Sequence, residues 1–248
     1  VLDEDVWQTE VGGFGLPPWL TAYALLHNWR VAQTAVGEKK SELAQEQSFP
    51  QSACRLVFGP FEQAFYEQVS VLFRQVYRYR DRWDNVAHFQ LAPTLTRYAG
   101  EPAFASVPER DPAPFLDALA LGWIEYRGLW QNILTPDNLS RLEQLAALPP
   151  DRFYFPADLW ARIVYDFVVV FNWGDYDPYR VAHSLYPIFL GRLAAFWQET
   201  AGLAVVGYEG TVAAQAVEFE EARSYLKIRW HTYPPLGTDD FSDEEHSL

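Results

Sequence analysis

The stretch that decides the fold is PADLWARIVYDFVVVFNW, residues 156–173. Apolar side chains occur almost all the way round this predicted helix, and a helix of that kind is buried in a protein core. We therefore expect it to be the central helix of the molecule. Asp166 interrupts the apolar run. Because a buried carboxylate is costly unless it is paired, the sequence predicts an ion pair with Arg162 or Arg192; the alternative is a carboxylate that faces a substrate.

The spacing of apolar residues predicts further helices around this central one. Steps of three and four residues place the apolar side chains on one face of each helix. Proline marks several first turns, and Thr135 is expected to cap the helix that begins at Pro136. The predicted helices are Pro17–Asn28, Gly59–Phe89, Ala113–Leu134, Pro136 to about Pro149, Asp177–Thr200 with a kink near Ser184–Pro187, and Glu209–Trp230.

The remaining segments lack helical periodicity. Arg30–Val36 is expected to form a short strand, and the polar stretch Glu38–Pro50 a loop. Prolines crowd the connection after the long helix, where they block regular structure. The predicted fold is mostly α: a helical bundle with a small N-terminal non-helical remnant. The predicted parts are a remnant over 1–50, a helical domain over 51–235 with a proline-rich connection at 90–114, and an acidic mobile tail at 236–248.

Charge and composition exclude several classes of function. The formal net charge is −14, so a general nucleic-acid binder or a protein held to an anionic membrane surface is disfavoured. Cys54 is the single cysteine, which excludes an internal disulfide and is typical of a reducing compartment. The longest apolar stretch falls far short of the ~20 residues that a membrane span requires. A cytoplasmic location is therefore expected.

Common catalytic motifs are missing from the sequence. It has no phosphate-binding loop, no Gly-rich dinucleotide fingerprint, no H-E-x-x-H and no G-x-S-x-G. Asp81, Asp84 and His88 would share one face of the long helix and are candidate metal ligands, although a solvated polar face is the simpler interpretation. His183 and Ser184 are adjacent, but neighbours on a helix point in different directions, so the pair is a weak signal for nucleophilic catalysis.

A basic cluster interleaved with aromatic residues follows the middle of the long helix. Guanidinium groups can hold phosphate and rings can stack a base, so Arg78 and Arg82 are candidate phosphate contacts. The alternative is that these arginines pair with the chain's own acids. The cluster consists of Arg74, Arg78, Arg80 and Arg82 with Tyr77, Tyr79 and Trp83.

The opening stretch GFGLPPWLTAYALLHNWRVAQTAVGEKKSEL resembles the end of the catalytic domain of family-2-type bacterial glycosyltransferases, the relatives of mannosylglycerate synthase and glucosyl-3-phosphoglycerate synthase. In that family a Gly-aromatic-Gly turn precedes Ile-Asp, an apolar pair and Thr, then a helix and a strand of the type R-V-x-Q-A-x-L-G-x-K. Here Gly13-Phe14-Gly15, Trp19-Leu20-Thr21 and Arg30 to Lys39 match these positions. Later segments, such as FLDALALGWIEYRGLWQNILTP and SLYPIFLGRLAAFW, resemble the helical C-terminal extension of the same proteins.

The resemblance implies a substrate-binding turn with altered chemistry. Gly13, Phe14, Trp19 and Thr21 would be the substrate-binding residues. Where the family has Ile-Asp after the turn this chain has Leu16-Pro17, and where it has Ile-His-Asp this chain has Lys40-Ser41-Glu42. The family's histidine would be a ligand of the divalent metal that holds the nucleotide diphosphate, a role that only Glu42 is left to take. The nucleotide-sugar-binding half, with its Asp-x-Asp motif, would lie upstream of Val1.

Three functions are therefore expected in descending order. The first is a helical C-terminal domain or partner subunit of a glycosyltransferase-like protein, inactive alone and without a cofactor, which associates with a catalytic half or with copies of itself. The second is a fragment of an active glycosyltransferase that uses Mn²⁺ or Mg²⁺ and moves a sugar from a nucleotide donor to a small acceptor. The third is a helical module that binds a phosphorylated ligand or assembles with a protein partner.

Overall fold

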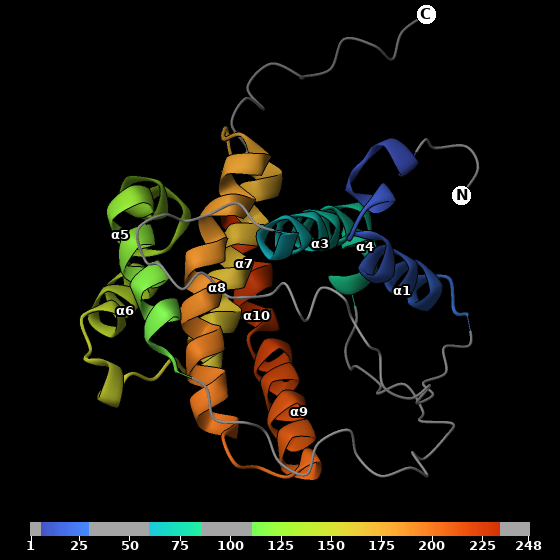
Figure 1. Ribbon diagram of the computed structural model, residues 1–248. Coiled ribbons are helices and arrows are strands. Elements are labelled where there is room, and N and C mark those ends of the chain that lie inside the picture. The colour runs from blue at the N-terminus through green and yellow to red at the C-terminus, as the bar shows by residue number, and fades with distance from the viewer. Residues whose placement is uncertain (1–5, 30–59, 86–110, 234–248) are drawn as a thin grey trace, which may run out of the picture.

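The computed structural model describes residues 6–29, 60–85 and 111–233, and all the regular structure of these residues is helical (Figure 1). This confirms the predicted mostly α-helical bundle. The helices are η1 Val6–Gln8, η2 Glu10–Gly12, α1 Leu16–Leu26, α3 Pro60–Arg78, α4 Arg80–Trp83, α5 Ala113–Ile133, α6 Pro136–Ala146, η3 Pro150–Arg152, α7 Ala157–Trp173, α8 Pro178–Thr200, α9 Val205–Glu221 and α10 Arg223–Thr232. The predicted strand at Arg30–Val36, the loop to Pro50, the proline-rich connection and the acidic tail lie largely or wholly outside the described residues.

Helix α7 is the central helix, as its sequence predicts. Its residues Ile163, Phe167 and Val169 have no exposed surface. The helix packs against α8, α9, α10 and α3, so apolar side chains are needed around nearly its whole circumference (Figure 1). The main hydrophobic core gathers around it from all the long helices of the bundle.

Helices α5 and α8 approach each other closely because two glycines lie at their contact. A Cβ atom on Gly122 would lie 2.3 Å from Cβ of Pro187, and one on Gly191 would lie 2.8 Å from Cδ2 of Leu119. Trp130 fills the core beside them with no exposed surface and donates from its indole nitrogen to the carbonyl of Ser184 at 2.9 Å. Helix α8 continues through Pro187 at this contact.

Two of the predicted long helices are broken in two. The helix expected over Gly59–Phe89 stops at Arg78, and α4 begins one residue later, after Tyr79. The break lets the Trp83 indole fold back and donate to the carbonyl of Val76 at 2.7 Å. The last helix likewise divides at Ala222 into α9 and α10. The turn at Ala222 aims α10 at the centre of the bundle, where it meets Asp166.

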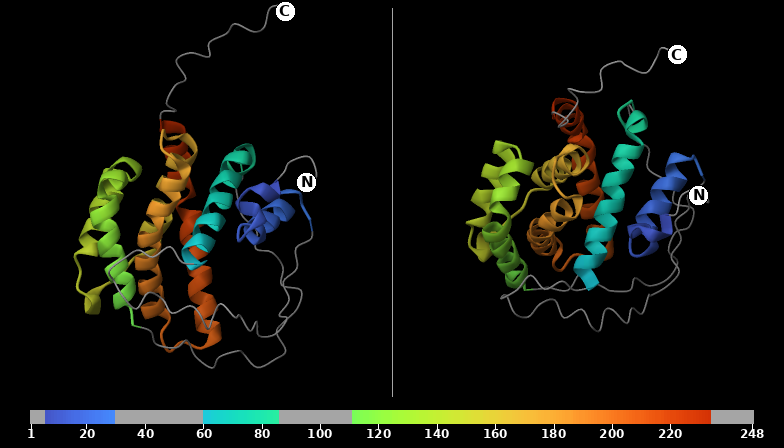
Figure 2. Two further views of the ribbon diagram at one scale, coloured as in Figure 1. Left: turned by 45° about the horizontal axis from the view of Figure 1, so that its top comes forward. Right: turned by 90° about the horizontal axis from the view of Figure 1, so that it is seen from above.

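The N-terminal helices form a small unit on the outer side of α3. Figure 2 shows α1 at one edge of the molecule, with α3 between it and the rest of the bundle. Here Val11 and Trp19 pack against Val71 of α3, with Leu16 and Tyr23 at the margin of this second core. The unit therefore rests on α3 in the way that a separate layer rests on a bundle.

Candidate functional site

The Gly13-Phe14-Gly15 turn, predicted to bind substrate, is held against helix α3 by Glu67. The Phe14 amide donates to Oε2 of Glu67 at 2.6 Å, and Gln63 donates to the other carboxylate oxygen at 2.8 Å. Because Gln63 lies one turn before Glu67 on the same helix, it fixes the direction of the carboxylate. The turn is therefore attached to a rigid element through its own backbone.

The two glycines of the turn are required by this close approach. A Cβ on Gly13 would lie 2.3 Å from Oε2 of Glu67, and one on Gly15 would lie 2.5 Å from the Glu10 carbonyl oxygen and 2.6 Å from Cγ2 of Val71. Distances this short cannot be met without a shift of the turn or of the helix. The Gly-aromatic-Gly pattern thus has a physical cause in the docking of the turn on α3.

Glu10 fastens the same unit to α3 at a second point. Its carboxylate accepts hydrogen bonds from both terminal nitrogens of Arg74 and from the Tyr66 hydroxyl at 3.1 Å. Burial acts to raise the pKa of Glu10, but the hydrogen bonds and the charge of Arg74 outweigh it and leave the pKa below its ordinary value. Burial, and next the Glu10 charge, raises the pKa of Tyr66 to about 12.

The four residues predicted to bind substrate differ in their exposure. Phe14 keeps 37% of its surface exposed, and Gly13 and Thr21 are also exposed. Trp19 is only 7% exposed and stacks on Tyr23 with ring centroids 5.2 Å apart, so it supports the turn from below. The structure thus gathers all four in one unit but presents three of them to solvent.

The predicted phosphate-binding cluster is engaged within the chain. Arg74 pairs with Glu10, Arg80 lies 4.8 Å over the Tyr77 ring, and Arg82 donates to the carbonyl of Leu26 at the end of α1. The break at Tyr79 also separates Arg78 from Arg82, which do not share one continuous helix. These contacts favour the alternative weighed from the sequence, in which the arginines serve the chain's own structure.

The predicted metal ligands do not form a site within the described residues. In the part of the chain that the structure describes, no three His, Cys, Asp or Glu side chains gather as a metal site requires. Asp84 instead accepts from His231 at 3.1 Å and lies 3.7 Å from Lys227. His88 and Glu42, the other candidates, lie outside the described residues.

Asp166 is fully buried and fully hydrogen-bonded. It accepts from the Tyr225 hydroxyl at 2.6 Å, from Nδ2 of Asn138 at 2.7 Å, from Nε of Arg229 at 2.9 Å and from the Thr135 amide at 3.1 Å. These donors come from α10 and from the start of α6, so the carboxylate ties both to α7. With its lone pairs occupied by structural donors, Asp166 acts as a cross-link of the bundle.

The partners predicted for Asp166 were wrong. Arg162 lies over the Tyr225 ring at 5.4 Å, and Arg192 forms a two-pronged pair with Glu199 at 2.7 and 2.9 Å. The capping role predicted for Thr135 is also wrong, because its hydroxyl contacts the Tyr225 hydroxyl at 3.2 Å and makes no cap bond. Its backbone amide serves Asp166 instead.

A buried His183–Glu62 pair joins α8 to α3. Nδ1 of His183 lies 3.3 Å from Oε1 of Glu62, and both side chains are less than a tenth exposed. The rings of Tyr66 and Tyr179 lie against the imidazole with centroids 4.8 and 4.0 Å away. Ser184 donates back to the Val181 carbonyl at 2.9 Å, so the adjacent His and Ser form no nucleophilic pair. Sequence reasoning missed Glu62, which carries no local signal.

Comparisons with protein-family models, with curated proteins and with solved structures found no match. Within the described residues, no helix is long and apolar enough to cross a membrane.

Proposed function

We propose that this chain is a helical, non-catalytic domain or partner subunit of a glycosyltransferase-like protein. In this role the bundle carries the last part of a catalytic domain, the unit of residues 6–29, and offers it to a catalytic half. The sequence resemblance supplies the class of protein. The observation that carries the proposal is the surface of helix α1.

Helix α1 is apolar on every side, yet it is packed on one side. None of the eleven residues of Leu16–Leu26 is charged. Trp19 alone in this helix is buried, while Leu20 and Leu25 keep 48% and 51% of their surface exposed. A helix that is hydrophobic all round is ordinarily enclosed by protein, and neighbouring apolar residues left exposed mark an interaction surface.

The surroundings of α1 extend this exposed surface. Trp7 and Trp29, at either end of the unit, are each 56% exposed, and Phe14 of the turn lies between them in the sequence. If residues 6–29 are the end of a catalytic domain, this outer face is where the remainder of that domain would pack. The anchors to α3 through Glu67 and Glu10 would then hold the catalytic domain on the bundle.

Binding to a catalytic half tests the proposal. The wild-type chain is titrated with the separately purified nucleotide-sugar-binding half of a family-2-type glycosyltransferase. The double variant Leu20→Glu, Leu25→Glu should weaken binding at least tenfold, since burying each leucine is worth roughly 1.5–3 kcal/mol. Ile124→Glu is the matched control, because Ile124 is 80% exposed on α5 across the bundle from α1 (Figure 2).

Circular dichroism first establishes that all three proteins are equally folded. Wild-type affinity in the Ile124 variant together with a loss in the double variant supports the proposed role. Equal affinities in all three, or no binding by any of them, contradicts it. A second copy of the chain is the other occupant to test, and sedimentation of the same three proteins reports it.

A further inference from the structure

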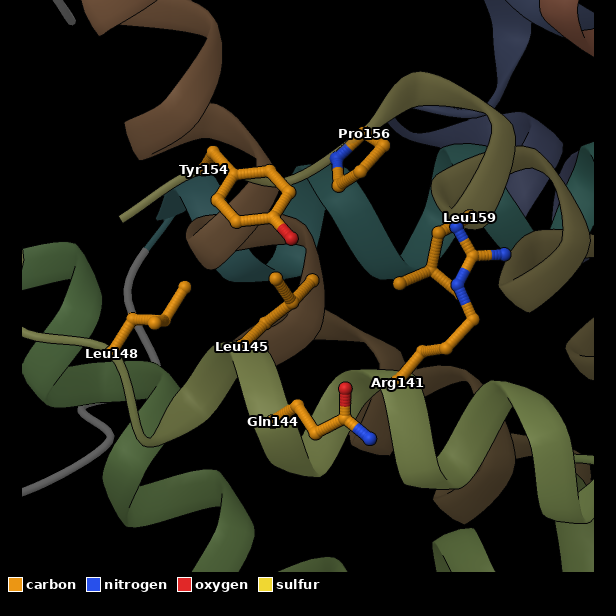
Figure 3. A pocket seen from close by; sticks show the side chains of 7 residues that line it. All are labelled: Arg141, Gln144, Leu145, Leu148, Tyr154, Pro156 and Leu159. Atoms are coloured by element: carbon orange, nitrogen blue, oxygen red, sulfur yellow. The ribbon is translucent and has the colours of Figure 1, made fainter. Parts of the chain in front are cut away.

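A hollow of about 200 Å³ lies between helix α6 and the segment that leads into α7. Figure 3 shows Arg141 and Gln144 rising from α6 on one side, with Tyr154 and Pro156 facing them on the other. Leu145, Leu148 and Leu159 supply the apolar part of the lining. The hollow is therefore an apolar floor bordered by a few polar groups, which is the usual composition of a small-molecule site.

Tyr154 is directed outward by the backbone on which it stands. Its neighbours Phe153 and Phe155 are 7% and 0% exposed, whereas Tyr154 is 59% exposed. In an extended segment successive side chains point to opposite sides, so the two buried phenylalanines hold the tyrosine in place at the rim. One face of an immobilised ring is thus available without an entropic cost of ordering the segment.

The polar groups at the rim offer both donors and acceptors. Nη2 of Arg141 donates to Asp158 at 2.9 Å, and its other nitrogens make no hydrogen bond within the described residues. The side-chain nitrogen of Gln144 reaches Ser140 at a long 3.4 Å, while its oxygen and the Tyr154 hydroxyl meet no partner in the described part of the chain. These groups can therefore still bond to a ligand.

The charge at the rim is balanced. Arg141 disfavours a cation, and Asp158, with the formal net charge of −14, disfavours an anion. A neutral ligand that carries hydroxyls avoids both penalties, because each hydroxyl both donates and accepts. Its C–H face would lie on the tyrosine ring and the leucines, and a volume of about 200 Å³ suits one six-membered sugar ring.

We propose that this hollow is a binding site for a single neutral sugar ring. Tyr154 is its platform, and Arg141 and Gln144 are its hydrogen-bonding partners. The site lies across the bundle from the Gly13-Phe14-Gly15 turn, at the far edge of the molecule (Figure 1). The inference does not depend on the proposed function, because it needs neither a nucleotide nor a catalytic half.

Saturation-transfer NMR on the full chain tests the site. The probes are methyl α-glucopyranoside and methyl α-mannopyranoside, with methyl phosphate and tetramethylammonium as charged competitors. We expect millimolar binding of at least one glycoside, unaffected by either ion. Tyr154→Ala and Gln144→Ala should each weaken it about tenfold without loss of fold, since both side chains are exposed. Trp29→Ala, which removes a ring of nearly equal exposure on the opposite edge, is the control.

The outcomes separate clearly. A glycoside signal that falls in the Tyr154 and Gln144 variants and persists in the Trp29 variant supports the site. Loss in the Trp29 variant alone places sugar binding at the N-terminal unit and overturns the inference. Binding of methyl phosphate in place of the glycosides makes Arg141 an anion contact and also overturns it. The absence of any glycoside signal does the same, whatever the titration with a catalytic half shows.

Discussion

Replacing Gly15 with alanine should release the N-terminal unit from helix α3. The new Cβ would lie 2.5 Å from the Glu10 carbonyl oxygen and 2.6 Å from Cγ2 of Val71. One of these contacts is with backbone and the other with a buried, β-branched side chain, so neither can yield easily. Overpacking of this kind costs about 1–3 kcal/mol, and here the cost falls on the docked state of the turn.

The expected signal is local. A loss of about 1–3 kcal/mol corresponds to a roughly 5- to 150-fold increase in the opening equilibrium of the unit. Native-state hydrogen exchange reads this at the amide of Phe14, which Glu67 protects, and at that of Trp19. Amides of α7 should exchange as in the wild type, because the bundle core does not include the turn.

Gly210→Ala is the matched control with the opposite sign. No atom lies within 4 Å of a Cβ at Gly210, which is inside helix α9. Alanine there should stabilise its helix by about 0.5–1 kcal/mol because it lowers the entropy of the unfolded chain. Unchanged exchange at Phe14 in the Gly15 variant, or the same direction of change in both variants, would refute the argument that close approach requires Gly15.

Further predictions concern the buried acids. Asp166→Ala should lower the free energy of unfolding by about 3–5 kcal/mol in urea denaturation, because it leaves buried donors unpaired; Asp158→Ala, at a surface ion pair, should cost under about 1 kcal/mol. The Glu10 contribution to docking of the N-terminal unit should be present above pH 4.5, its ordinary pKa, and disappear as pH falls through the lower folded value. Glu10→Gln should abolish that pH dependence of exchange at the turn. In the same variant the pKa of Tyr66 should fall from about 12 towards 10, as measured by tyrosinate absorbance against a Tyr66→Phe reference.

Much of the bundle is predictable from local sequence. Helix α7 and the starts of α5 and α6 follow from long apolar periodicity and from prolines at first turns. The breaks at Tyr79 and Ala222 do not, because neither position carries a proline or a glycine. They are imposed by tertiary contacts, such as the return of Trp83 onto Val76. Local propensity yields where such contacts are stronger.

The candidate site was predictable in part. The need for a partner at Asp166 follows from its apolar surroundings, but the partner, Arg229, comes from α10 and is 63 residues away. Periodicity on one helix can suggest only neighbours such as Arg162. The turn at Gly13 was found through its resemblance to a family, whereas its anchor Glu67 lies 53 residues beyond Phe14. Sequence spacing carries no information on contacts of that range.

The absence of sugar transfer by this chain alone is the central claim, and it has a direct measurement. The purified chain is heated with UDP-, GDP- and ADP-sugars, each with and without Mn²⁺, and release of the nucleoside diphosphate is followed in parallel. A ligand that binds the folded state raises the unfolding midpoint. We predict that no donor raises the midpoint with Mn²⁺ and that no diphosphate is released. A manganese-dependent rise with one donor, accompanied by release of its diphosphate, would contradict the account and make the chain itself an active glycosyltransferase.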